Sequence, residues 1–380
     1  MGKILEYLSW RGDLDFDKDP LNDIDALILA LLSYLSFKGI VPEVGSDEDI
    51  SLKEASDQFI SARQNMQDEA SAVNPTLSST FNSGLLELLR VTANCPRFAE
   101  IHCSKYDENT DYVVGRQFGA LTFTLPSRKH EKVVAFRGTD NSLIGWKEDF
   151  EIACMKEIPA QESAYKYLDD VTGFLSSKVT VCGHSKGGNL AVYAGSRVSA
   201  ADRRKITKIV NFDGPGFDFS ILPRESFSNC EAKVCNYVPE ESIVGMLLEQ
   251  VGKRVVVSST ARGLNQHNAL NWRVKRAQFL PGTMSEMTKL LEQTLNTWLA
   301  DLSLSKRKSF IDALFDILGA AEGRTIDPKE EIKRSKEILV KYSKLDLETK
   351  RLLLDVFSSL RAQTRNTLSK TIRENLPRIT

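Results

Sequence analysis

Residues 179–192 read VTVCGHSKGGNLAV, and this stretch decides the fold of the chain. The apolar run over 179–182 predicts a buried β-strand, and the small residues after Gly187 predict the first turns of a helix. Between them lies Gly-x-Ser-x-Gly, with Ser185 at its centre. Glycines there remove the β-carbons that would collide where the strand and the helix cross. We therefore predict a nucleophile elbow that lifts the Ser185 hydroxyl clear of a sheet; an ordinary glycine-rich turn is the alternative.

The segments around this motif alternate between strand and helix patterns. Residues 117–125 and 132–137 predict a hairpin that enters the sheet, and residues 98–103 also have an extended pattern. The sheet then becomes parallel, because apolar strands alternate with helical stretches. These strands lie around positions 179, 209, 234 and 255, and the helices are expected at 164–175, 190–198 and 243–251. The fold class is therefore α/β with a mainly parallel central sheet.

Helical patterns flank this core on both sides. Apolar residues over 24–35 recur at steps of three and four, and a second helix is expected over 52–68. After about position 283 the alternation stops and three helical patterns follow, at 287–298, 310–318 and 332–360, with a break at Asp327-Pro328. We predict an N-terminal helical segment over 1–95 packed on an α/β core over 96–282, and a C-terminal helical extension over 283–380. The charges of the extension are mixed in sign, which favours a solvated helical face over membrane or calmodulin-like binding. We expect these helices to pack on the core or to bind a partner.

Composition excludes several classes of protein. The 380 residues hold 50 Lys and Arg against 51 Asp and Glu, so nothing favours a nucleic-acid partner. The six cysteines contain no CxxC pair, which is typical of reduced thiols. The most apolar window, 26–37, is shorter than the roughly 20 residues that a transmembrane helix needs, and the first residues lack a secretion pattern. We predict a cytoplasmic protein without a transmembrane segment.

A serine at an elbow needs a histidine to take its proton and an acid to orient that histidine. The chain has four histidines, at positions 102, 130, 184 and 267. In the chain order of serine, acid and histidine, His267 is the candidate, because it follows both the elbow and the apolar strand around position 255. His184 lies beside the nucleophile, where its side chain is expected to point away from the hydroxyl. His267 is therefore the predicted base.

Three carboxylates compete for the role of the acid. Asp213 ends the strand after the elbow helix, whereas Glu240 and Glu241 end the next strand and lie closer in sequence to His267. Chain order allows each of them. We favour Glu241, with Asp213 as the alternative acid and Glu240 as the third candidate. If Asp213 is not the acid, we expect its side chain to stabilise the turn that it occupies.

Ester cleavage also needs donors for the oxyanion that forms in the transition state. The backbone N–H of Lys186 follows the nucleophile directly, and Thr139 follows a strand that ends in a glycine turn, so these two residues are the predicted donors. The alternative for the segment that contains Thr139 is an ordinary turn in which Arg137 and Asp140 form a surface ion pair.

Four motifs together resemble the class 3 lipase superfamily of α/β-hydrolases. They are FRGTD at 136–140, Trp146 with Asp149, GHSKGG at 183–188 and DGPG at 213–216. VPEESIVG at 238–245 and NQHN at 265–268 are more similar to a poorly characterised bacterial branch of that superfamily.

This resemblance implies an α/β-hydrolase fold with Ser185 as nucleophile, His267 as base and Thr139 as oxyanion donor. It also implies an acid at Glu241, where lipases usually carry aspartate. Lys186 follows the nucleophile and adds positive charge near the pocket mouth, which would favour anionic substrates.

The predicted function is that of a serine hydrolase that cleaves carboxylic esters through an acyl-enzyme on Ser185, without a metal or organic cofactor. The partner is then a small-molecule ester or a lipid, and residues 142–146 are expected to form an apolar lid over the site. The alternatives are a thioesterase or small-acyl esterase, and a non-catalytic interaction protein that binds a partner with its C-terminal helices.

Overall fold

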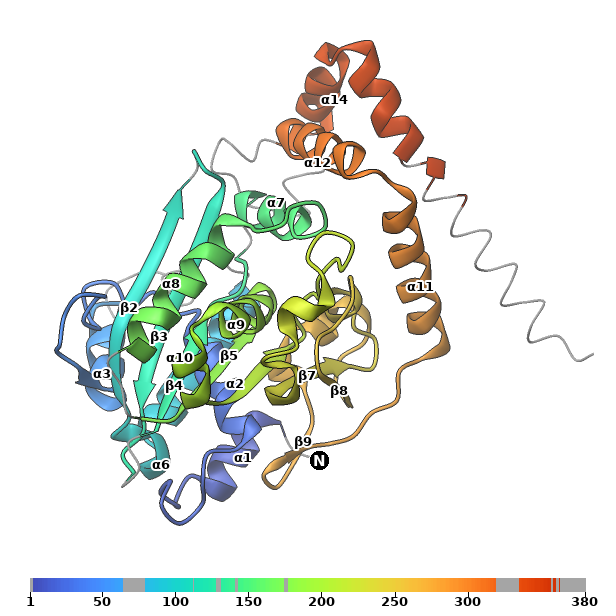
Figure 1. The fold of residues 1–380 in the computed structure, drawn as a ribbon. Helices are drawn as coiled ribbons and strands as arrows, with labels where there is room; N and C mark the ends of the chain where they lie inside the picture. The colour runs from blue at the N-terminus through green and yellow to red at the C-terminus, as the bar shows by residue number, and fades with distance from the viewer. Residues whose placement is uncertain are drawn as a thin grey trace, which may run out of the picture.

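The centre of the molecule is an eight-stranded sheet in the order β1 to β8 (Figure 1). The computed structural model describes residues 3–63, 79–111, 113–127, 131–140, 143–173, 177–318, 335–356, 358–359 and 362. Neighbouring strands from β1 to β4 are antiparallel, and those from β4 to β8 are parallel. The strands are β1 (Ile50–Ser51), β2 (His102–Asp111), β3 (Arg116–Thr124), β4 (Lys132–Phe136), β5 (Val179–His184), β6 (Ile206–Phe212), β7 (Val234–Pro239) and β8 (Lys253–Val257).

Strand β5 lies inside the parallel part, between β4 and β6, and is buried along its whole length. Its register sets Cys182 beside Ala135 of β4 on one side and beside Val210 of β6 on the other. A strand covered on both faces needs a continuous apolar run rather than an alternating one. The run that precedes Ser185 in the sequence meets this requirement.

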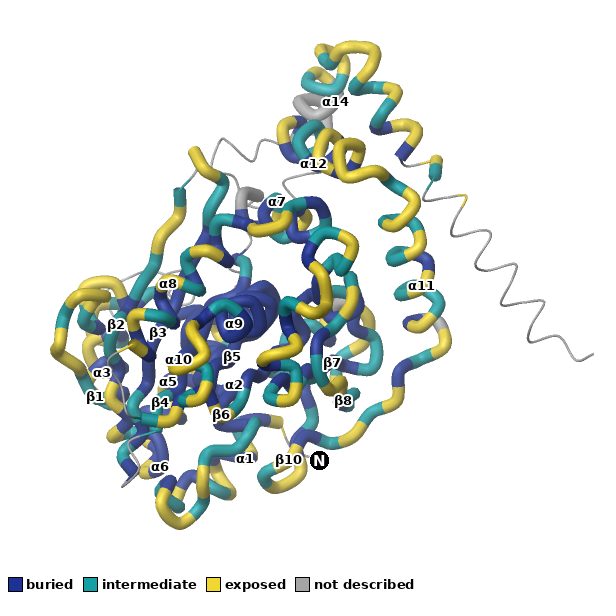
Figure 2. The backbone as a smooth tube through the Cα atoms, in the orientation of Figure 1, coloured by how far each residue is buried: buried dark blue, intermediate teal, exposed yellow. Residues whose placement is uncertain are grey.

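Helices cover both faces of the sheet, and each face has its own hydrophobic core. Alternate strand residues point to opposite cores: Val133 and Ala135 face the N-terminal helices, whereas Val134 and Phe136 face α8 and α9. Figure 2 shows α9 almost entirely in the colour of buried residues, near the centre of the molecule. The first face carries α1 (Ile4–Arg11), α2 (Asp23–Leu32), α3 (Leu52–Ser61), α5 (Ser79–Ala93) and α6 (Pro96–Ala99), and the second carries α8 (Pro159–Gly173), α9 (Lys186–Arg197) and α10 (Ala200–Lys205).

Of the C-terminal helices, α12 and α14 lie above the short helix α7 in Figure 1, whereas α11 runs along the side of the molecule next to β8. They follow the small hairpin of β9 and β10, and α12 packs against α7 and α14. The remaining elements are α7 (Leu143–Glu151), β9 (Val274–Lys275), β10 (Gln278–Phe279), α11 (Glu286–Asp301), α12 (Leu304–Leu318), α14 (Ser335–Lys344) and the 3₁₀ turns η1 (Arg224–Phe227), η2 (Glu231–Lys233), η3 (Val244–Met246), η4 (Gly263–His267) and η5 (Ala269–Asn271). This arrangement is an α/β-hydrolase fold, as expected from the sequence.

Two local predictions are wrong. Residues 98–103 are not one extended segment, because Pro96 starts the short helix α6 and β2 begins only at His102. Residues 243–251 are not a helix beyond the short turn η3, because Leu248 has a φ of 66° and Phe217 bridges to Glu249. The helix predicted at 52–68 ends earlier than expected, because α3 ends at Ser61 with Ala62 as its C-cap. Both ends of the pattern predicted at 332–360, and the break at Asp327-Pro328, lie outside the described residues.

Within the part of the chain that the structure describes, no helix combines the length and apolar character needed to cross a membrane.

Candidate active site

Ser185 occupies a strained turn between β5 and α9. Its φ of 58° and ψ of −134° lie outside the regions that most residues adopt. The flanking glycines make the crossing possible: a β-carbon on Gly183 would lie 2.1 Å from the carbonyl oxygen of Gly187, and one on Gly187 would lie 2.1 Å from that of Phe136. The Ser185 backbone N–H donates to the Phe212 carbonyl at 2.9 Å. The motif therefore forms the predicted elbow.

His267 reaches Ser185 from the turn η4, after β8. Its Nε2 lies 2.9 Å from Ser185 Oγ, and its Nδ1 lies 2.7 Å from Asp213 Oδ2. A carboxylate can only accept, so Nδ1 carries the proton and Nε2 is free to accept the serine hydroxyl proton. The three side chains thus form a continuous chain from acid to base to hydroxyl.

Asp213 sits in the turn directly after β6 and is fully buried. Its φ of 54° turns the side chain back towards His267, a conformation that aspartate tolerates better than most residues. The Ser242 hydroxyl donates to Oδ1, and a β-carbon on Gly245 would lie 2.3 Å from that oxygen. Burial raises the pKa of the Asp213 carboxyl, and the hydrogen bonds from His267 and Ser242 oppose this rise.

The preference for Glu241 as the acid is not supported by the geometry. Its carboxylate accepts hydrogen bonds from the Gly263 N–H and from Gln266 Nε2, and its own N–H donates to Gln266 Oε1 at 2.9 Å. Glu240 instead accepts from the Thr283 N–H. Closeness in sequence misled the prediction, because the Glu241 carboxylate braces the loop that carries His267 and does not contact the imidazole.

Thr139 follows β4 and lines the same cavity as Ser185. Its hydroxyl donates to Asp149 Oδ1 at 2.7 Å, which leaves the Thr139 and Lys186 backbone N–H groups as the candidate oxyanion donors. Burial raises the pKa of Asp149 to about 6, while the hydrogen bond from Thr139 lowers it. The alternative of a surface ion pair is wrong, because Arg137 is buried and pairs with Glu108.

The side chain of Lys186 does not lie at the pocket mouth. Its Nζ is fully buried, 2.7 Å from Glu148 Oε2 and 3.0 Å from the Gln117 carbonyl oxygen. The first residue of α9 therefore directs its charge towards β3 and α7. The predicted preference for anionic substrates loses its basis, because this charge is already neutralised inside the protein.

His184 and Tyr34 form a support that the sequence did not reveal. The His184 Nε2 lies 2.8 Å from the His267 carbonyl oxygen, so it must donate, and Nδ1 then accepts from the Tyr34 hydroxyl at 2.9 Å. Burial lowers the pKa of His184 to about 3, so the ring stays neutral. Tyr34 follows α2 and is far from the motif in sequence, so no local signal linked it to the site. Of the other histidines, His102 pairs with Asp49 near the surface, and His130 lies outside the described residues.

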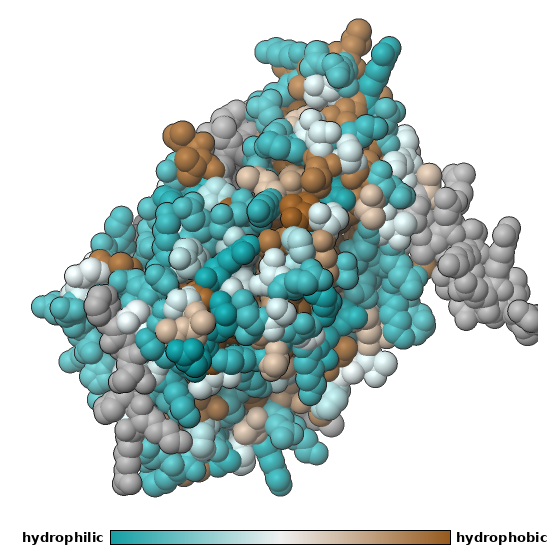
Figure 3. Space-filling view, viewed as in Figure 1, coloured by the Kyte–Doolittle hydropathy of each residue, from teal (hydrophilic) through white to brown (hydrophobic). Residues whose placement is uncertain are grey.

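A cavity of about 870 Å³ opens above Ser185 and His267. Its lining is mostly apolar and comes from α7, the loop before β8, and the helices α11 and α12. In Figure 3, hydrophobic surface gathers in the upper part of the molecule around α7 and α12. The predicted lid falls partly here: Trp146 lines the cavity, whereas Ser142 lies outside the described residues.

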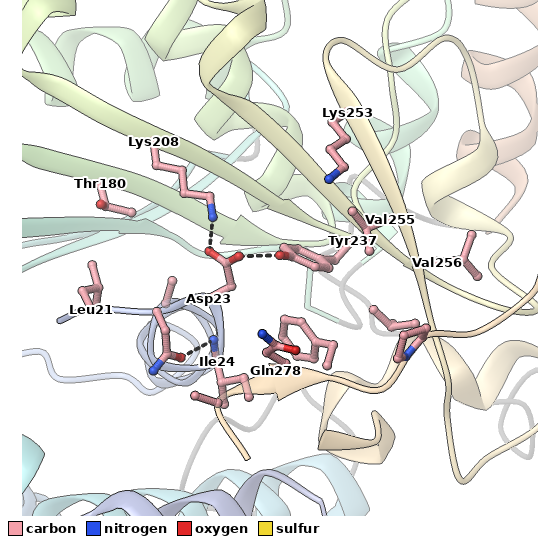
Figure 4. A pocket seen from close by; sticks show the side chains of 16 residues that line it. Leu21, Asp23, Ile24, Thr180, Lys208, Tyr237, Lys253, Val255, Val256 and Gln278 are labelled. Atoms are coloured by element: carbon pink, nitrogen blue, oxygen red, sulfur yellow. Dashed lines mark hydrogen bonds and ion pairs between the residues drawn. The ribbon is translucent and has the colours of Figure 1, made fainter. Parts of the chain in front are cut away.

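A second cavity of about 570 Å³ lies between the start of α2 and the strands β6 to β8 (Figure 4). Asp23 accepts hydrogen bonds there from Lys208 and from the Tyr237 hydroxyl. None of Ser185, His267 and Asp213 lines this cavity. Asp23, Lys208 and Tyr237 are already hydrogen-bonded to one another, and they do not form an activated nucleophile like the one at Ser185.

Residues 92–316 match the model of the Mbeg1-like family, which is more than half of the chain. The chain belongs to the Mbeg1-like family. The match begins within α5, includes all three residues of the hydrogen-bonded chain at Ser185, and ends within α12. This Mbeg1-like chain matches none of the curated proteins.

Solved structures similar to this Mbeg1-like chain include three lipases. The lipase of Rhizomucor miehei in complex with its propeptide is 19% identical, with a TM-score of 0.30, over 43% of this chain and 59% of the lipase. M37 lipase is 14% identical, with a TM-score of 0.35, over 72% and 79% of the two chains. Lip2 lipase from Yarrowia lipolytica is 14% identical, with a TM-score of 0.33, over 56% and 82%. These values are too low to transfer an activity.

Proposed function

We propose that this chain is a serine hydrolase that cleaves carboxylic esters through an acyl-enzyme on Ser185. The observation that carries the proposal is the hydrogen-bonded chain from Asp213 through His267 to Ser185 Oγ. Serine alone is a weak nucleophile, and this arrangement is the one that activates it.

In the first half of the reaction, Ser185 Oγ attacks the ester carbonyl carbon while His267 Nε2 takes the hydroxyl proton. The oxyanion is stabilised by the Thr139 and Lys186 backbone N–H groups. The tetrahedral intermediate collapses, the carbon–oxygen bond to the alcohol breaks, and His267 returns the proton to the leaving alcohol. Asp213 stays ionised and stabilises the imidazolium.

In the second half, water replaces the alcohol. His267 takes a proton from the water, the hydroxide attacks the acyl carbon, and the ester bond to Ser185 breaks. The carboxylic acid leaves, and Ser185 regains its proton from His267. The cycle consumes one ester and one water and requires no change of oxidation state.

Hydrolysis of short p-nitrophenyl esters tests this proposal. We expect Ser185→Ala and His267→Ala each to lower kcat/KM by about a thousandfold or more. Ser226→Ala is the matched control, because this serine lies in the turn η1, away from the cavity. Activity that survives both site substitutions at the wild-type level would overturn the proposal.

A further inference from the structure

One face of α11 is apolar and lines the cavity above Ser185. Leu295, Trp298 and Leu299 follow one another at short helical steps, Leu302 comes directly after the last residue of the helix, and all four line that cavity. Each is half-buried, whereas Thr297 on the same helix is exposed. An amphipathic helix normally buries such a stripe against other side chains. Here the stripe forms a wall of a cavity.

The first half of α12 extends the same wall. Phe310 and Ile311 are buried and line the cavity together with the α11 stripe. Trp146 of α7 and Leu247, which comes directly after η3, also line it. The cavity volume of about 870 Å³ is near the upper end of the roughly 300–1,000 Å³ range of small-molecule sites.

Polar contacts fix this wall to the body of the protein. The Asn296 side chain on α11 accepts from the Leu248 N–H at 3.0 Å and donates to the Met246 carbonyl at 3.3 Å. The Arg307 side chain on α12 donates to the Ala153 carbonyl and to Asp218 Oδ2, both at 2.6 Å. The wall therefore has a defined position relative to the loop around η3 and the end of α7.

The charges of the lining favour an uncharged occupant. Arg307 lines the cavity, but Asp218 neutralises its guanidinium. Asp149 lies beside Thr139 and accepts a hydrogen bond from its hydroxyl. Burying an unpaired ionic group against the remaining apolar wall would be costly, whereas burying an alkyl chain is favourable by about 0.8 kcal/mol for each methylene.

We propose that α11 and the first half of α12 form the binding wall for a long acyl chain, with Leu299 and Leu302 as residues that determine acyl length. The occupant is the acyl chain of an ester, because the same cavity contains Ser185 and His267, which would react with that chain's carbonyl. This inference rests on the proposed hydrolase function and adds the substrate class.

Alkyl fluorophosphonates that carry either an ethyl or a hexadecyl chain test the proposal on the full chain. In the wild type, we expect the hexadecyl reagent to modify Ser185 at least about tenfold faster than the ethyl reagent. Leu299→Trp fills part of the cavity and should lower the ratio of the hexadecyl rate to the ethyl rate by about tenfold. Thr297→Trp adds the same ring to the exposed face of α11 and should change neither rate.

Equal rates for the two reagents in the wild type, or an equal loss of both in Leu299→Trp, would overturn the inference. A direct binding measurement separates this failure from that of the hydrolase proposal. In a Ser185→Ala background, a hexadecyl chain with an environment-sensitive fluorophore should bind, and Leu299→Trp should weaken its binding where Thr297→Trp does not. Binding without any Ser185 modification in the wild type would support the wall and contradict the hydrolase; no binding would overturn the wall.

Discussion

His184 Nε2 donates a hydrogen bond to the backbone carbonyl of His267, with 2.8 Å between the two heavy atoms. The two rings also lie against each other, with centroids 4.8 Å apart and an angle of 34° between their planes. His184 immediately precedes Ser185, so the end of β5 positions both the proposed nucleophile and the loop of the proposed base. This contact explains why a distant loop returns to within hydrogen-bonding distance of the elbow.

The buried neutral state of His184 predicts an acid-dependent loss of stability. Burial lowers the pKa of His184 to about 3, below its ordinary value, so between pH 6.5 and 3 the unfolded chain binds more protons and stability falls as the pH falls. This contribution is about 1.4 kcal/mol per pH unit below pH 6.5. At pH 7, His184→Gln should be less stable than the wild type, because it disturbs two buried hydrogen bonds.

At pH 5 the gap between His184→Gln and the wild type should shrink by about 2 kcal/mol, since the substitution removes the buried imidazole. Urea denaturation of both proteins at the two pH values measures this difference. A gap that stays constant would contradict a neutral buried His184.

Asp213, rather than Glu241, is expected to act as the acid. Asp213→Asn should lower kcat/KM for a short ester by about a thousandfold or more, because an amide no longer stabilises the imidazolium. Glu241→Gln should lower it by about tenfold at most, since the amide oxygen can still accept the Gly263 N–H. Steady-state kinetics of the pair decides between the two residues, and the reverse ranking would restore Glu241.

Gly245 leaves the space that the Asp213 carboxylate needs. An added β-carbon would lie 2.3 Å from Oδ1, so Gly245→Ala should displace the carboxylate and lower kcat by about tenfold or more. Gly173→Ala is the matched control, because among the described residues no atom outside the neighbouring helix backbone lies within 4 Å of its added β-carbon. Equal activity of the two variants on a short ester would show that the space at Gly245 does not matter.

The buried pair of Lys186 and Glu148 should contribute to stability rather than to substrate binding. Lys186→Met leaves the Glu148 carboxylate buried without its cation and should cost about 3–5 kcal/mol of unfolding free energy. The double variant Lys186→Met, Glu148→Gln should recover part of that loss, because it removes both charges. Thermal or urea unfolding of the wild type and the single and double variants measures this, and an additive loss in the double variant would contradict the pairing.

The sequence predicted those features that depend on local patterns. The strand before Ser185 and the glycines of the elbow follow from residue type and spacing alone, and the structure places them as expected. His267 was found by chain order, and the structure brings its Nε2 to the Ser185 hydroxyl. Local pattern and chain order were sufficient for these two residues because Ser185 directly follows β5 and His267 lies in the loop after β8.

Features that depend on the direction of a side chain were not predictable. The positive φ of Asp213 turns its carboxylate towards His267, and nothing in the sequence distinguished it from Glu241. The Lys186 side chain points from the start of α9 into the protein, where its Nζ donates hydrogen bonds to Glu148 Oε2 and to the Gln117 carbonyl oxygen. Tyr34 follows α2 and belongs to the core on the face of the sheet that α9 does not cover, so only the folded structure shows its contact with His184.

Reaction of the purified chain with a short alkyl fluorophosphonate, followed by mass spectrometry of the adduct, tests the central claim most directly. The reagent modifies only an activated serine, and the account predicts one adduct on Ser185 that is lost in Ser185→Ala and formed at least about a hundredfold more slowly in His267→Ala. Absence of an adduct on Ser185, or an unchanged rate in folded His267→Ala, would contradict the claim that these residues form an active hydrolase site.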